Sequence, residues 1–186
     1  MFDEIAPLPA EPPAAALHAM IAGYPLSAAL CVAAELAIAD LLVDGSRTND
    51  ELAAETGTDA PSLARVLRAP ARVGVFAGDA SDNWRLTPRA EPLRSDVPGS
   101  LRPVSRLLGA TWSWEPWAEL LYIVRTGESA LQHRFWMDRF ADLAANPELN
   151  AIFHEAMAGF TAAEMAAVAG HEFAGVGTVV DVRGGN

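Results

Sequence analysis

The segment from Leu26 to Val43 restricts the possible folds of this chain more than any other feature. Its apolar residues fall on every side of a helical wheel, and a helix of that kind is buried all round. Such a helix needs either a large core or a partner chain to cover it. A chain of 186 residues holds one domain of ordinary size, so we favour the partner and expect a homodimer through helix 26–43.

Two acidic residues argue against a membrane span in this segment. Glu35 and Asp40 would each cost about 2.5–3.5 kcal/mol near the centre of a bilayer, and alanine adds little insertion energy. The whole chain has 13 Lys and Arg residues against 24 Asp and Glu residues, a formal net charge of −11. That charge repels anionic lipids and phosphate backbones. We therefore expect neither a membrane nor a nucleic acid as a partner.

The N-terminus and the cysteine content indicate the cellular compartment in which the protein is expected. Residues 1–13 are acidic and rich in proline, without the basic start and apolar segment of a signal peptide, and they predict a flexible tail. The one cysteine, Cys31, has no second cysteine for an internal disulfide. A cytoplasmic location is therefore expected.

Two short helices are predicted next. Thr48 and Glu51 have the spacing of a capping box, which opens the first helix, and Gly57 closes it. The second covers residues 61–69, because Pro70 lacks the N–H that a helix interior needs.

A β-hairpin is predicted after these helices. Residues 73–76 and 84–87 have strand composition, and residues 79–83 between them are turn-like. Helix, turn, helix and hairpin together form a winged-helix plan. Winged helices commonly bind DNA, but the basic residues near this second helix make only a modest patch, and we favour a packing role. The basic residues are Arg65, Arg68, Arg72 and Arg85.

Residues 100–174 are predicted to be helical and rich in aromatic side chains. Pro116 suits the first turn of a helix. The inward positions of that helix are spaced i, i+3, i+4 and i+7, and they are Trp117, Leu120, Leu121 and Val124. A later helix begins after an Asn146 N-cap and has the clearest amphipathic pattern of the chain. Its apolar positions are Leu149, Ile152, Phe153, Ala156, Met157 and Phe160.

Residues 178–186 have the composition of a strand that ends in an acid and a glycine turn. Asp181 follows β-branched residues, and Gly184 and Gly185 come shortly after it. A parallel strand delivers a carboxylate and a tight turn to a nucleotide-like ligand in this way. One parallel strand cannot build a sheet, because its neighbour needs a crossover of about a dozen residues. We therefore expect a mainly α fold with one orphan C-terminal strand.

The order of these features resembles one protein family. Besides the buried helix and the winged helix, the motifs are Ser95-Asp96-Val97-Pro98-Gly99, Trp112-x-Trp114, Arg125-Thr126-Gly127-Glu128, Asn146-Pro147-Glu148-Leu149 and Val179-Val180-Asp181-Val182. The chain looks like the N-terminal part of the S-adenosylmethionine-dependent small-molecule O-methyltransferases, of the caffeate and actinobacterial polyketide type. The resemblance implies a dimerisation region with a winged helix at 14–99, a helical region that roofs the substrate at 100–174, and the start of a Rossmann-like cofactor domain at 175–186.

The resemblance also implies S-adenosylmethionine as the cofactor of the family, with Asp181, Gly184 and Gly185 at the start of its site. This chain departs from the family where Arg183 replaces a glycine that lets the backbone approach the ligand. It also stops at Asn186, before the family's catalytic histidine. We therefore expect neither a bound cofactor nor methyl transfer by these residues alone, and we assign no catalytic residue. No histidine has a metal-binding spacing, so no metal is expected.

A set of aromatic, Met and His residues forms the candidate wall of a pocket for an aromatic small molecule. Aromatic faces and thioethers pack well against planar ligands, although each residue taken singly is more often part of a plain core. The candidates are Trp112, Trp117, His133, Phe135, Met137, Phe153, Met157 and Phe160.

The favoured hypothesis is the dimerisation and substrate-binding portion of an O-methyltransferase that acts on an aromatic or polyketide-like molecule. One alternative is a stand-alone dimer that binds a small molecule. Another is an enzyme that catalyses a cofactor-free step, such as cyclisation. A winged-helix DNA-binding protein is the less favoured alternative.

Overall fold

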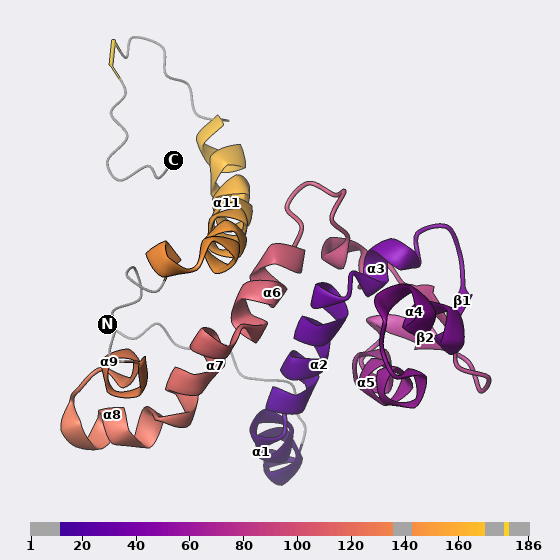
Figure 1. The fold of residues 1–186 in the computed structure, drawn as a ribbon, viewed down its shortest axis with the longest axis horizontal. Coiled ribbons are helices and arrows are strands. Elements are labelled where there is room, and N and C mark those ends of the chain that lie inside the picture. Colours follow the sequence, from indigo (N-terminus) through magenta and orange to yellow (C-terminus); the bar gives the residue numbers. More distant parts are fainter. Residues whose placement is uncertain (1–11, 136–142, 170–176, 179–186) are drawn as a thin grey trace.

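The structure, a computed structural model, describes residues 12–135, 143–169 and 177–178. Helices dominate these residues, as the sequence predicts, and the described strands form a small antiparallel sheet (Figure 1). The helices are α1 Pro13–Ile21, α2 Tyr24–Glu35, α3 Ile38–Leu41, α4 Asn49–Thr56, α5 Ala60–Arg72, the 3-10 helix η1 Glu91–Leu93, α6 Arg102–Gly109, α7 Thr111–Ala118, α8 Leu120–Thr126, α9 Ala130–Phe135 and α11 Pro147–Ala169. The strands are β1 Arg47–Thr48, β2 Phe76–Gly78 and β3 Asn83–Leu86.

The predicted winged-helix unit is present and contains the main core. The Glu51 N–H donates to the Thr48 hydroxyl and the Thr48 N–H donates to the Glu51 carboxylate, which is the predicted capping box. β2 and β3 form the hairpin, and β1, which the sequence did not reveal, pairs with the other edge of β3. Helices and sheet share a cluster of buried side chains that includes Ile38, Leu42, Leu52, Leu67, Phe76 and Trp84.

The predicted continuous helix 26–43 is wrong, because two helices, α2 and α3, cover this segment. Ala37 adopts a left-handed backbone with φ of 53° and separates them. Arg102 from α6 caps the break, since its Nε donates to the Ala34 carbonyl at 2.9 Å. A helical wheel cannot locate such a break, because the segment is apolar on both sides of it.

Two predicted boundaries also differ from the structure. α5 runs through Pro70 and ends at Arg72, because a proline in the last turn removes only one helical hydrogen bond. Val73 and Gly74 then form the turn after α5, and the first hairpin strand begins at Phe76. The predicted strand 73–76 is therefore misplaced, although the hairpin itself is correct.

Helix α6 lies between α2 and α11 and connects the winged helix to the C-terminal helices (Figure 1). Gly109 permits a close approach to α2, since a β-carbon at this position would lie 2.6 Å from Cys31 Cβ. An ion pair between Arg106 and Glu35 joins the same two helices. On its other side α6 contacts α11, whose Ala156 is fully buried.

The predicted inward face after Pro116 is wrong. Pro116 lies inside α7, and the chain continues into a separate helix, α8, at Leu120. The residues of that face are exposed in this chain: Trp117, Leu120, Leu121 and Val124. Helix α1 is also uncovered, because none of its residues is buried. It begins at Pro13, inside the predicted tail 1–13.

Several predictions fall outside the described residues. They concern Met137, the orphan C-terminal strand, Asp181, Gly184 and Gly185. Within the described ranges, no single helix is long and apolar enough to cross a membrane, and α1 with α2 would qualify only as a pair bent by 43°. The same ranges contain no group of three or more His, Cys, Asp or Glu residues arranged to hold a metal ion.

Candidate functional site

A cavity of about 370 Å³ lies between α2, the junction of α6 with α7, and α11, and we call it the α2–α11 cavity. Its wall is mainly apolar. Cys31 and Val32 come from α2, Trp114 comes from α7, and Ile152 comes from α11. Small-molecule sites commonly measure about 300–1,000 Å³ and have mostly apolar walls with a few polar groups. The α2–α11 cavity therefore has the size and the apolar character of a small-molecule site.

An ion pair supplies the charged groups of this wall. Arg106 Nε lies 2.8 Å from Glu35 Oε2, and Arg106 Nη2 lies 3.2 Å from Glu35 Oε1. The hydrogen bond from Arg106 holds the pKa of Glu35 below its ordinary value, and Glu35 in turn raises the pKa of Arg106. Both groups are therefore charged at neutral pH, and either one offers hydrogen bonds to a polar substituent of a bound ring.

A second hollow of about 280 Å³, the α2–α7 groove, adjoins the first. Leu30, Leu108 and Trp117 line it, and it shares Cys31 and Trp114 with the α2–α11 cavity. Burial raises the pKa of the Cys31 thiol. Because the thiolate is the reactive form, Cys31 is suited to packing at neutral pH rather than to nucleophilic attack.

Of the predicted site residues, Trp117 alone belongs to the described lining of these two hollows. Trp117 lines the α2–α7 groove and is 69% exposed. Trp112, Phe153 and Met157 are half-buried, on α7 and α11. α11 contributes the neighbouring Ile152 to the described lining of the cavity. Phe135 and Phe160 belong to α9 and α11.

His133 lies on α9, away from the described lining of both hollows. Its ring stacks on Tyr122 of α8 with 4.0 Å between centroids and 18° between planes. The Tyr122 hydroxyl donates to the Glu128 carboxylate. The described contacts of His133 thus hold α8 against α9.

Sequence reasoning missed Cys31, Arg106 and Glu35 as lining residues. The Arg106–Glu35 pair joins positions 71 residues apart, and no local pattern reports such a contact. Trp114 did carry a signal, since it belongs to the Trp112-x-Trp114 motif. That motif identified the correct helix but not which tryptophan faces the cavity.

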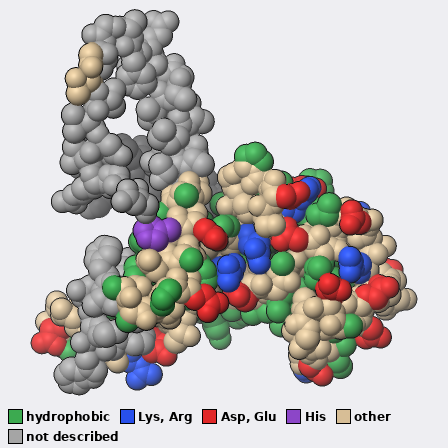
Figure 2. All heavy atoms as spheres, turned by 45° about the horizontal axis from the view of Figure 1, so that its top comes forward, with side chains coloured by type: hydrophobic (Ala, Val, Ile, Leu, Met, Phe, Trp, Pro, Cys, Tyr) green, Lys and Arg blue, Asp and Glu red, His purple; other side chains and the backbone are tan. Residues whose placement is uncertain are grey.

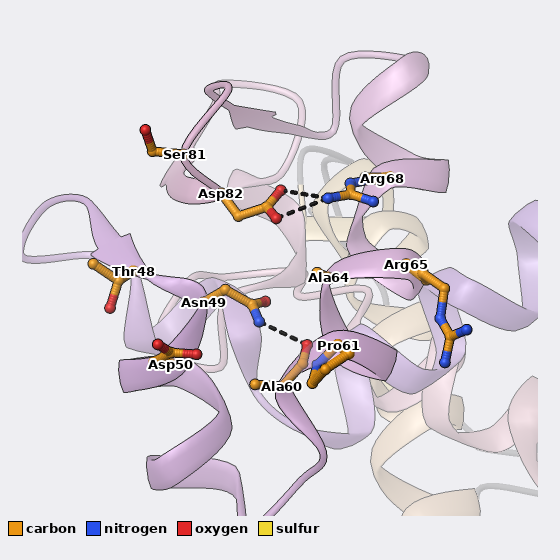
Figure 3. A pocket seen from close by; sticks show the side chains of 10 residues that line it. All are labelled: Thr48, Asn49, Asp50, Ala60, Pro61, Ala64, Arg65, Arg68, Ser81 and Asp82. Carbon is orange, nitrogen blue, oxygen red and sulfur yellow. Dashed lines mark hydrogen bonds and ion pairs between the residues drawn. The ribbon is translucent and has the colours of Figure 1, made fainter.

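A third hollow of about 650 Å³ lies in the winged helix, between the start of α4, α5 and the β2–β3 turn (Figure 3). Two pairs of its polar groups are joined by hydrogen bonds. Arg68 donates to both carboxylate oxygens of Asp82 at 2.7 and 3.0 Å, and Asn49 Nδ2 donates to the Ala60 carbonyl at 2.6 Å. Basic side chains lie among acidic ones on the face in Figure 2 and form no continuous basic patch there.

Comparisons with known proteins find one matching domain family and several related methyltransferases. The O-methyltransferase dimerisation domain family matches residues 19–96. The phenazine O-methyltransferase PhzM of Lysobacter antibioticus is 41% identical over 95% of this chain and 52% of its own length. The crystal structure of LaPhzM covers 88% of this chain and 49% of its own chain, with 41% identity and a TM-score of 0.81.

A further solved relative was crystallised with its ligands. The neocarzinostatin O-methyltransferase NcsB1, in complex with S-adenosylmethionine and 2-hydroxy-5-methyl naphthoic acid, is 30% identical, covers 85% of this chain and 49% of its own, and has a TM-score of 0.71. The chain thus spans about half the length of the relatives it matches. Residues 19–96 therefore match the O-methyltransferase dimerisation domain family, and the chain is similar to about half the length of methyltransferases such as PhzM.

Proposed function

We propose that this chain is the dimerisation and substrate-binding portion of an O-methyltransferase that acts on an aromatic or polyketide-like small molecule. The observation that carries the proposal is the apolar α2–α11 cavity, which lies beside the matched dimerisation domain. Cys31 and Val32 of that domain form one wall of the cavity. Dimerisation and ligand binding thus share a helix.

The cavity suits a flat ring system that carries one polar group. Trp114 offers an aromatic face, and Arg106 offers guanidinium hydrogen bonds to a carboxylate or hydroxyl. Relatives with the same fold support this class, since their names refer to a phenazine and to a naphthoic acid. Trp112, Phe153 and Met157 are proposed to border the ligand where α7 and α11 approach the cavity.

Ligand binding tests the substrate-binding half of the proposal. We expect 2-hydroxy-5-methyl naphthoic acid or a hydroxyphenazine, added to the 186-residue protein, to quench tryptophan fluorescence with saturation. Trp114→Ala is expected to weaken binding about tenfold, which corresponds to about 1.4 kcal/mol. Val73→Ala, an exposed site in the winged helix, is the matched control. Absence of saturable binding by the wild type would refute this half.

Sedimentation tests the dimerisation half, in which α2 and its neighbours form the contact. We expect a homodimer at micromolar concentration. Leu30 packs partly against the core, so Leu30→Asp tests folding as well as association. Tyr24→Asp is cleaner, because Tyr24 is 67% exposed at the start of α2, and it is expected to give a folded monomer. A folded wild-type monomer at that concentration would refute the dimer.

S-adenosylmethionine is the cofactor of the family, and we do not propose that these residues alone bind it. Asp181, Gly184 and Gly185 are the residues proposed to begin its site, and Arg183 is proposed to hinder the approach of the ligand. Calorimetric titration of S-adenosylmethionine into the wild type and into Arg183→Gly tests this. We expect no binding by the wild type, so a micromolar dissociation constant for it would overturn the proposal.

A further inference from the structure

The two members of the charged pair in the α2–α11 cavity are unequally exposed. Arg106 and Glu35 both line the cavity, but the Arg106 side chain is 18% exposed and the Glu35 side chain is 57% exposed. Arg106 Nε and Nη2 donate to the two Glu35 oxygens at 2.8 and 3.2 Å. A carboxylate has about four lone-pair sites, so Glu35 keeps free acceptor sites while it holds Arg106. The more accessible charged group of the pair is therefore the carboxylate.

Two further acidic residues lie on the α11 side of Arg106. Glu148, Ile152 and Glu155 share one face of α11 at spacing i, i+4 and i+7, and Ile152 lines the cavity. The hydrogen bond to Glu35 is the main reason why the pKa of Arg106 is raised, and the charges of Glu155 and Glu148 raise it further. The guanidinium thus lies among several carboxylates rather than beside one.

Arg102 does not reverse this balance. Its charge lowers the pKa of Glu35, although less than the hydrogen bond from Arg106 does. Arg102 Nε, however, donates to the Ala34 carbonyl and lies 3.9 Å from the Asp40 carboxylate. Both arginines therefore have an acidic partner, and the two glutamates of α11 leave an excess of negative charge beside the cavity.

This arrangement favours one kind of ligand substituent. A ligand carboxylate that bound the remaining N–H groups of Arg106 would share one guanidinium with Glu35, and like charges within about 4–6 Å disfavour each other's charged forms. An amino or hydroxyl group instead donates to a free oxygen of Glu35, because an ionised carboxylate is an acceptor only. The donor gains a charge-assisted hydrogen bond, whereas the carboxylate meets repulsion.

We propose that Glu35 makes the α2–α11 cavity selective for aromatic molecules that carry an amino or hydroxyl donor and that it discriminates against aromatic carboxylates. The inference rests on the proposed substrate-binding function and narrows the polar group of its ligand to a donor. The apolar wall of Val32, Trp114 and Ile152 holds the ring, and Glu35 selects the substituent. Specificity here comes from a repulsive element as well as an attractive one.

Three ligands with one ring system test the selectivity. At pH 7, 2-aminophenazine presents a neutral N–H donor, phenazine presents no substituent, and phenazine-2-carboxylate presents an anion. Equilibrium dialysis against the 186-residue wild type measures the three dissociation constants. We expect 2-aminophenazine to bind about tenfold more tightly than phenazine-2-carboxylate, with phenazine between them.

Glu35→Gln separates the charge of this side chain from its shape. Glutamine keeps a carbonyl that accepts from Arg106, but it has no negative charge. We expect phenazine-2-carboxylate to bind Glu35→Gln about tenfold more tightly than the wild type, and 2-aminophenazine to bind it more weakly. A gain in affinity cannot come from a variant that fails to fold. Glu55→Gln removes the same charge from an exposed site on α4 and should leave each dissociation constant within about twofold of the wild-type value.

The other outcomes separate the inference from the function on which it rests. If the three ligands bind and the carboxylate binds as tightly as the amine, the selectivity is overturned and the substrate-binding function stands. If Glu35→Gln and Glu55→Gln improve binding of the carboxylate equally, the net charge of the chain repels anions, and the assignment to Glu35 is overturned. If none of the three ligands binds, the inference and the substrate-binding function both fail.

Discussion

Cys31 of α2 and Gly109 of α6 meet so closely that a β-carbon at position 109 would lie 2.6 Å from Cys31 Cβ. Gly109→Ala is therefore expected to lower the free energy of unfolding by about 1–3 kcal/mol, which is the usual cost of overpacking a core. Urea unfolding measures this change. Cys31→Gly should recover part of this loss in the double variant, whereas Cys31→Ala, which keeps the β-carbon, should not. Equal recovery by both would show that the two positions do not clash.

The Arg106–Glu35 pair predicts a stability difference that depends on pH. Arg106 holds the pKa of folded Glu35 below its ordinary value, so the pair stabilises the fold above the unfolded pKa of about 4.3 and loses its effect as pH falls through the folded pKa. Because Glu35 is 57% exposed, Arg106→Gln should cost at most about 1 kcal/mol at pH 7. Urea unfolding of the wild type and of Arg106→Gln, measured from pH 7 to pH 3, should show that the difference between their unfolding free energies becomes smaller as pH falls. A difference that grows toward low pH would contradict the assignment.

Asn49 joins the two helices of the winged helix through its hydrogen bond to the Ala60 carbonyl at 2.6 Å. Asn49 is 8% exposed, so Asn49→Ala removes a largely buried bond and should lower the unfolding free energy by about 1–3 kcal/mol. Glu55→Ala changes an exposed side chain on the same helix and should stay within about 0.5 kcal/mol of the wild type. Equal effects of the two changes would mean that the Asn49 bond adds nothing.

Ala37 adopts the left-handed backbone between α2 and α3, which costs an L-residue about 1–2 kcal/mol. Ala37→Gly removes that cost but makes the unfolded chain more flexible, so we expect a net gain of about 0.5–1 kcal/mol in thermal or urea unfolding. Ala54→Gly, on an exposed face inside α4, should instead lose about 1 kcal/mol. A loss at both positions would rule out the left-handed conformation of Ala37.

Local chemistry made part of this fold predictable. The capping box of Thr48 and Glu51, the Gly57 helix end and the hairpin depend on a few neighbouring residues, and the sequence displays them directly. The mainly α class and the resemblance to O-methyltransferases followed from the order of such signals. The break at Ala37 is different, because Arg102 caps it from far along the chain.

The candidate site was harder to predict for the same reason. Trp117 and its neighbours have helical spacing, and spacing predicts a shared face without saying what covers it. In the structure of the single chain that face is exposed to solvent. The cavity wall comes from α2, α7 and α11 together, and its charged pair depends on how two distant helices pack. A pattern within one helix cannot supply that information.

The place of α6 between α2 and α11 also has a consequence for synthesis of the protein. Arg102 binds the Ala34 carbonyl across 68 residues, so the side of α2 that faces α6 stays bare while the ribosome makes the intervening chain. At about 5–20 residues per second this interval lasts about 3–14 s. During it the nascent chain presents to the cell a mostly apolar helix, whose one charged residue is Glu35. Capture of that helix by chaperones is the foreseeable hazard of making this protein.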